Sequence, residues 1–256
     1  MRTFIALLAS SLAAAAANAG VVIHMAAKSL PEGKQSHQTV YYAQGGYLRI
    51  DSLDDRGHVT SIDLMRDGVI WQMDVAKRTY EKFDKAHVQG QMQVMDERLN
   101  AMLAKLPPQQ RAIMEERMKK LKEPHIDVAW NDTGRSEKSG SYACRVWEEK
   151  RTGKVRGEYC VAAMGSLPGG DELAVSLKNA YATAKEALSG VPQAARILES
   201  YSKFNTMNGF PVVHREMMGG KPYEETVMTS IERQSLPADK FAIPKGFTEK
   251  QTGDEE

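Results

Sequence analysis

Six short runs of β-branched and aromatic residues follow one another between residues 21 and 83, and they constrain the fold more than any other feature. The runs are VVIHMAAK, QTVYYA, GYLRIDSL, VTSIDLMR, GVIWQMDV and KRTYEKF. Turn-forming residues such as Gly45-Gly46 and Asp67-Gly68 separate them. Runs joined by Asp-Gly turns are typical of a meander of antiparallel strands. Apolar residues alternate only partly along GYLRIDSL, so we expect a sheet with one covered face and one solvated face.

The hydrophobic period changes after the sixth run, where apolar residues recur every three or four positions. They are Val88, Met92, Met95, Leu99, Met102 and Leu106. This spacing places them on one stripe of a helix. Pro107-Pro108 interrupts the stripe and suits the first turn of a second helix. The inner face of that helix would include Ile113 or Met114, then Met118 and Leu121. The pattern predicts a helical hairpin inserted between strands at about residues 86–122.

The rest of the chain mixes strands with one long helix. Strand-like runs resume at HIDVAWND and continue through the segment that contains both cysteines. DELAVSLKNAYATAKEALSG has a helical stripe made of Leu173, Leu177, Ala180, Ala184 and Ala187. A short helix follows at AARILESYSKF, then strands at NGFPVVHREMM, YEETVMTSIERQSL and KFAIP. We expect one α+β domain over residues 20–250 and a disordered acidic tail at 251–256.

The two cysteines stand on either side of Arg151-Thr152-Gly153, which suits a three-residue hairpin loop with Gly in the left-handed conformation. In that register Cys144 faces Cys160, Glu148 faces Arg156, and Trp147 faces Gly157. Directly opposed strand residues are close enough for a disulfide. A redox pair is disfavoured because CxxC spacing is absent, and a metal site is disfavoured because histidine ligands are not nearby. We expect a structural disulfide.

The N-terminal sequence MRTFIALLASSLAAAAANAG has the order of a secretory signal peptide. Arg2 is followed by an apolar, alanine-rich stretch and then by Ala17-Asn18-Ala19, so residues 1–19 are the expected signal peptide and cleavage is expected after Ala19. Without a cysteine at that point a lipid anchor is not expected, and no second stretch is long and apolar enough to span a bilayer. We expect a soluble periplasmic protein.

Charge and motifs argue against several functional classes. The chain has 34 basic and 33 acidic residues, a net charge of +1 that disfavours a nucleic-acid-binding role. The six histidines lack metal-binding spacing, and no catalytic motif is present, so neither catalytic residues, a metal nor a cofactor is expected. The methionine stripe at Met92, Met95 and Met102 could bind a soft ion such as Cu(I). Methionines at helical spacing more often form an adaptable core or apolar contact surface.

Several segments together resemble a known family. They are YYAQGGYLRIDS, GVIWQMDVAKRTYEKF, SYACRVWE, GEYCVAAMGSLPG and FAIPKGF, which span roughly residues 21–247. They resemble an uncharacterised group of secreted bacterial proteins, domain of unknown function 4412, which is related to the LolA and LolB lipoprotein carriers. The resemblance implies a curved antiparallel sheet, an open LolA-like half-barrel, with helices on its concave side. In the carriers this cavity is apolar and takes acyl chains, and the helical hairpin here is an insertion relative to them.

These observations lead to two hypotheses of function. The first is a non-enzymatic binding protein for a lipid, an acyl chain or a lipoprotein segment, held between the sheet and the helices. The residues expected to line that site are Trp71, Met92, Met95, Leu99 and Met102. The second is an envelope interaction or stress protein that docks on partners through the hairpin, whose LPPQQRAIMEERMKKL segment resembles the LTxxQ motif of periplasmic stress proteins. The sequence leaves the ligand, the partner and the oligomeric state open.

Overall fold

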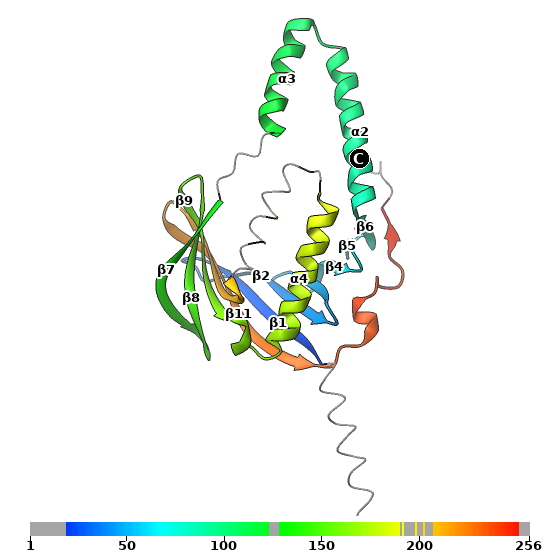
Figure 1. Cartoon of the computed structure of the whole chain (residues 1–256). Helices are drawn as coiled ribbons and strands as arrows, with labels where there is room; N and C mark the ends of the chain where they lie inside the picture. The colour runs from blue at the N-terminus through cyan, green and yellow to red at the C-terminus, as the bar shows by residue number, and fades with distance from the viewer. Residues whose placement is uncertain are drawn as a thin grey trace, which may run out of the picture.

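One large, curved and unclosed antiparallel sheet dominates the fold, an α+β architecture with three α-helices in the described part of the chain (Figure 1). The computed structural model describes residues 19–122, 128–189, 191, 198, 202 and 207–250. The expected signal peptide, the short helix expected in AARILESYSKF and the expected acidic tail lie mostly or wholly outside these residues. The twelve strands of the sheet have the order β12-β6-β5-β4-β3-β2-β1-β11-β10-β9-β8-β7.

The first six strands form the predicted meander. They are β1 (Gly20–Ser29), β2 (Gln35–Gln44), β3 (Tyr47–Leu53), β4 (Val59–Arg66), β5 (Val69–Asp74) and β6 (Thr79–Phe83). The β4–β5 turn shows why sequence reasoning succeeds here. Asp67 and Gly68 both have positive φ, 51° and 75°, which matches the strand twist in a two-residue hairpin. Local turn chemistry therefore sets the neighbours of each strand.

A second meander joins the first along β1. Its strands are β7 (Val128–Ser139), β8 (Tyr142–Arg151), β9 (Lys154–Ala163), β10 (Gly209–Met218) and β11 (Lys221–Gln234). Because β11 pairs with β1, strands from the two ends of the chain become neighbours in the middle of the sheet. The two-residue β12 (Thr248–Glu249) pairs with β6 in the parallel direction. The sheet thus runs from β12 at one edge to β7 at the other.

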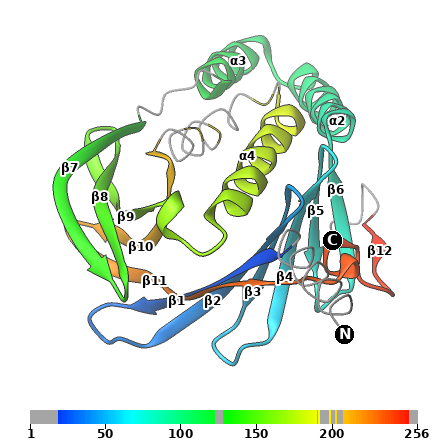
Figure 2. The same ribbon diagram turned by 60° about the horizontal axis from the view of Figure 1, so that its bottom comes forward.

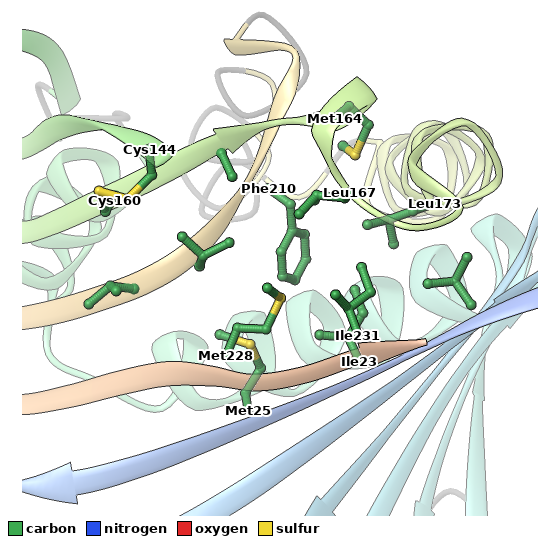
Figure 3. Packing of buried hydrophobic residues seen from close by; sticks show 14 of the residues in the cluster. Ile23, Met25, Cys144, Cys160, Met164, Leu167, Leu173, Phe210, Met228 and Ile231 are labelled. Carbon is green, nitrogen blue, oxygen red and sulfur yellow. A yellow bond between two sulfur atoms is a disulfide. The ribbon is translucent and has the colours of Figure 1, made fainter. Parts of the chain in front are cut away.

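The concave side of the sheet holds α4 (Gly170–Ala187), which lies between β7–β9 on one side and β4–β6 on the other (Figure 2). It follows a short 3-10 helix, η1 (Met164–Ser166), and packs against β1–β5. The predicted stripe is confirmed, since Leu173, Ala180 and Ala187 are buried. Phe210 contacts Tyr41 edge to face, with ring centroids 5.8 Å apart. Figure 3 shows Phe210 pointing toward Met228 and Ile231 in this core, which fills the space between α4 and the sheet.

The opposite face of the first meander is also covered, which corrects the expectation of a solvated face. Residues 236–247, named the C-terminal strap here, place Leu236 and Phe241 against Val22, Ile62 and Leu64. KFAIP was expected to be a strand, and this is wrong. Its first residues belong to a 3-10 helix, η2 (Ala238–Phe241). Two of its backbone carbonyls accept hydrogen bonds from side chains and not from a neighbouring strand. Arg49 Nη1 and Arg66 Nη1 donate to the carbonyls of residues 240 and 241, at 3.0 and 2.6 Å.

A buried ion pair lies beneath the C-terminal strap. Arg49 donates through Nε to Asp51 Oδ1 at 2.6 Å and through Nη2 to Oδ2 at 3.0 Å. The two residues are only 9% and 3% exposed. Lys240 approaches the same carboxylate, with Nζ 3.8 Å from Oδ2. The apolar strap residues and this charged cluster together fix the C-terminal strap to the sheet.

The helical hairpin projects away from the sheet (Figure 1). It consists of α2 (Lys85–Ala104) and α3 (Pro108–Lys122), close to the expected range. Asp84 caps α2 by accepting a hydrogen bond from the backbone N–H of His87 at 2.8 Å. Arg111 of α3 donates to the carbonyl oxygens of Leu103 and Ala104, both at 3.0 Å. These bonds satisfy two C-terminal carbonyls of α2 and fix the turn between the helices.

The disulfide between Cys144 and Cys160 is present, with Cα atoms 5.2 Å apart, but the predicted register of its hairpin is wrong. Thr152 and Gly153 alone form the turn, both with positive φ, so Arg151 pairs with Lys154. A β-bulge at residue 156 shifts the register by one further residue, so Cys160 faces Val146. The cysteines are diagonal neighbours on one face of the hairpin, which is close enough for the bond.

The shifted register also separates both side-chain pairs that were expected beside the disulfide. Glu148 faces Glu158, where Arg156 had been expected. Trp147 faces Tyr159, where Gly157 had been expected. The like charges of the two glutamates are balanced by nearby cations: Arg215 of β10 lies 2.7 Å from the Glu158 carboxylate, and Lys150 of β8 itself lies 3.5 Å from that of Glu148. Arg156 is left without its expected carboxylate.

Among the described residues, none of the helices combines the length and the apolar character needed to cross a bilayer.

The tight connection between η1 and α4 gives a direct test of the fold. A Cβ atom on Gly170 would lie 1.8 Å from the Met164 carbonyl oxygen, so Gly170→Ala requires the backbone to move. We expect a loss of about 1–3 kcal/mol in the free energy of unfolding, measured by urea denaturation. Gly165→Ala is the matched control, because a Cβ there meets no described atom within 4 Å. Equal stability of the two variants would contradict this packing.

Candidate functional site

The structure places four of the five expected ligand-lining residues on α2, with very different exposures. The stripe starts at Val88, which is buried near the sheet. Met92 and Leu99 are half-buried, whereas Met95 and Met102 are 54% and 48% exposed. The stripe is therefore covered on one side and open to solvent on the other.

Trp71 lies apart from those four residues. It pairs across strands with Leu64 and belongs to the apolar cluster under the C-terminal strap. The Arg66 guanidinium lies over its ring, 5.2 Å from the centroid. Because α4 packs on the other face of this sheet, the structure does not bring Trp71 together with the α2 stripe.

A groove of about 390 Å³ lies between α2 and the residues that follow α4. Val88 and Met92 give it an apolar part on α2, and Ser189 and Val191 line the other side. The rest of its lining is polar: Gln89, Gln93, Asp96, Glu97 and Asn100. A lining of both apolar and polar side chains suits a ligand that combines an apolar chain with a polar end.

A second cavity, of about 470 Å³, lies at the β8–β9 turn and was not expected from the sequence. Arg151, Thr152, Lys154 and Arg156 line it. The RTGKVR segment does carry a sequence signal for a basic site, since three cations occur within six residues. The wrong register concealed it, because Arg156 was expected to pair with a glutamate on β8.

A buried polar network lies next to this second cavity and bonds to one of its lining residues, Arg151. Glu149 is 2% exposed and accepts hydrogen bonds from Arg151 Nε at 2.6 Å and from the Tyr159 hydroxyl at 3.1 Å. His214 stacks on Tyr159, with ring centroids 4.2 Å apart. Burial, reinforced by the Glu149 charge, raises the pKa of Tyr159, so this phenol remains a donor. Burial lowers the pKa of His214, which favours the neutral imidazole.

In the described ranges no three histidine, cysteine, aspartate or glutamate side chains are grouped so that they could hold a metal ion.

Comparisons with known proteins give little further guidance. No family model and no curated protein matches the chain. An uncharacterized conserved protein from Thermus thermophilus is 7% identical, with a TM-score of 0.41, and the alignment covers 95% of this chain and 98% of that one. PNGF-II is 10% identical with a TM-score of 0.42, and the alignment covers 91% of this chain but only 31% of that protein. Similarities at this level do not assign a function.

Proposed function

We propose that this protein binds an apolar ligand without catalysing a reaction, and that the ligand lies along α2 in the groove next to the end of α4. The candidate ligands are a lipid, an acyl chain or a lipoprotein segment. The observation behind the proposal is that the apolar part of the groove, Val88 and Met92, continues into the exposed Met95 and Met102 along the same helix. Methionine suits such a surface because its flexible thioether adapts to varied apolar shapes.

The proposed site differs from the one expected from the carriers. The core around Leu173 and Phe210 fills the space between α4 and the sheet, so a ligand there would have to displace a packed core. The groove beside α2 requires no such rearrangement. A LolA-like half-barrel that binds its ligand at an inserted hairpin, secreted into the periplasm, is the form of the proposal that combines the sequence resemblance with these contacts.

A partner protein is the second candidate, favoured by the way the hairpin projects from the sheet (Figure 1). Arg111 holds the turn between α2 and α3 through hydrogen bonds to carbonyl oxygens of α2. Ile113 on α3 is 55% exposed, away from the groove residues. An arm of this kind with exposed apolar side chains is suited to protein docking.

Titration with a fluorescent fatty acid tests the first candidate and separates it from the second. We expect saturable uptake by the wild type and an affinity roughly tenfold lower for Met92→Gln, because a polar amide replaces an apolar contact. Ile113→Gln is the matched control on the same hairpin and is expected to retain uptake. Absence of saturable uptake by the wild type would sink the apolar-ligand proposal. Loss of uptake in Ile113→Gln but not in Met92→Gln would mean that the fatty acid binds at the exposed side of α3 around Ile113 and not in the groove.

A further inference from the structure

The cavity at the β8–β9 turn has a feature that ordinary charged turns lack, namely a β-bulge that redirects one of its cations. Glu149 pairs with Gly157 and Lys150 pairs with Val155, so Arg156 has no partner across the hairpin. A bulge of this kind changes the direction of a side chain. Arg156 consequently lines the same cavity as Arg151 and Lys154, which pair with each other at the turn.

The three cations are held in different ways. Arg151 is oriented by its hydrogen bond to the buried carboxylate of Glu149. The Tyr159 hydroxyl donates to the same carboxylate and fixes its position. Glu149 balances the charge of Arg151, and Glu216 adds a weaker attraction to it. Lys154 and Arg156 are exposed, and neither makes an ion pair with any residue that the structure describes. The cavity therefore combines one oriented guanidinium with two uncompensated positive charges.

The close packing beneath the cavity depends on Gly157. A Cβ atom at this position would lie 2.6 Å from the Tyr159 ring and 3.2 Å from Glu149 Oε2. A side chain there would displace the groups that orient Arg151. The glycine is thus required by the network that supports the cavity and not by the turn itself.

We propose that this cavity binds a phosphate group, either that of a small phosphate ester or that of a lipid headgroup. A phosphate presents several oxygens that accept charge-assisted hydrogen bonds from separate donors, which suits cations converging from both strands. Thr152 adds a hydroxyl donor at the turn. The volume of about 470 Å³ leaves room for the group attached to the phosphate. The site is separate from the α2 groove and does not depend on the proposed function.

Calorimetric titration with inorganic phosphate and with glycerol 3-phosphate, together with sedimentation on phosphatidylcholine vesicles with and without phosphatidic acid, tests the proposal. Lys154→Gln combined with Arg156→Gln is expected to weaken binding at least about tenfold, since each substitution removes a charge-assisted contact. Lys138→Gln is the matched control. This exposed lysine lies on β7 beside the β7–β8 turn, at the opposite end of β8 from the cavity. Thermal unfolding of all variants monitors folding.

Two positive outcomes identify the source of the phosphate. Binding of the soluble phosphates supports a small phosphate ester, whereas binding only to vesicles with phosphatidic acid supports a lipid headgroup. The proposal is overturned if neither binds, if the double variant binds as the wild type does, or if Lys138→Gln weakens binding equally. Uptake of the fluorescent fatty acid should be unchanged in the double variant, so failure of this site and failure of the α2 groove are distinguishable.

Discussion

Asp51→Ala is expected to lower the free energy of unfolding by about 3–5 kcal/mol, measured by urea denaturation. Asp51 is 3% exposed and accepts two hydrogen bonds from Arg49, which is itself only 9% exposed. The substitution leaves a guanidinium under the C-terminal strap without its carboxylate. An uncompensated buried charge costs more than the pair contributes, because the guanidinium has lost its water and keeps no negative charge beside it.

Two further variants make this expectation specific to the ion pair. Asp55→Ala removes an exposed aspartate from the following turn and is expected to change stability by less than about 0.5 kcal/mol. Replacing the pair together, as Arg49→Met with Asp51→Leu, should recover most of the loss, since apolar residues of similar size fit the surrounding cluster. A cost below about 1 kcal/mol for Asp51→Ala would mean that water reaches Arg49 and that the strap does not cover this face.

The second large effect concerns the disulfide. Replacing both Cys144 and Cys160 with alanine is expected to lower the free energy of unfolding by about 3 kcal/mol, because the bond closes a loop with a sequence separation of 16 and restricts the unfolded chain. Both residues are buried, so the lost sulfur atoms also leave a packing defect. Urea denaturation of the oxidised wild type and of the double variant gives the difference.

Reduced wild-type protein is the control for this experiment. Its stability should approach that of the double variant, since both lack the crosslink. If the double variant is as stable as the oxidised wild type, the β8–β9 hairpin is held without the bond. In that case the crosslink would not be needed to stabilise the hairpin.

Sequence reasoning succeeded where local chemistry decides the structure. The six strands of the first meander follow from β-branched runs and turn residues such as Asp67-Gly68. The burial of Leu173, Ala180 and Ala187 follows from helical spacing in α4. In these segments the side chains that set the pattern also touch one another or the nearest strand.

Sequence reasoning failed where contacts between distant residues decide. A three-residue loop in place of Thr152-Gly153 displaces the predicted partner of Cys160 by one position, and the bulge at Arg156 displaces it by one more. KFAIP has strand-like composition, but carbonyl oxygens in this segment accept hydrogen bonds from the side chains of Arg49 and Arg66 on other strands. The local sequence of KFAIP does not indicate that two arginines, distant in the chain, will donate hydrogen bonds to its carbonyl oxygens.

The candidate ligand site shows the same division. Helical spacing identified the α2 stripe, and the structure keeps Met92 in a groove while it exposes Met95 and Met102. Trp71 was grouped with them on residue type alone. Its position in the sheet instead places it under the strap, on the other face from α4.

The most direct test of the central proposal is to isolate the protein from the cells that make it and to analyse the bound molecules by lipid mass spectrometry. The proposal predicts an apolar molecule, a lipid, a fatty acid or a lipidated peptide, in near-stoichiometric amount in the wild type and much reduced in Met92→Gln. Wild-type protein that contains no apolar molecule, or contains the same amount as Met92→Gln, would contradict it.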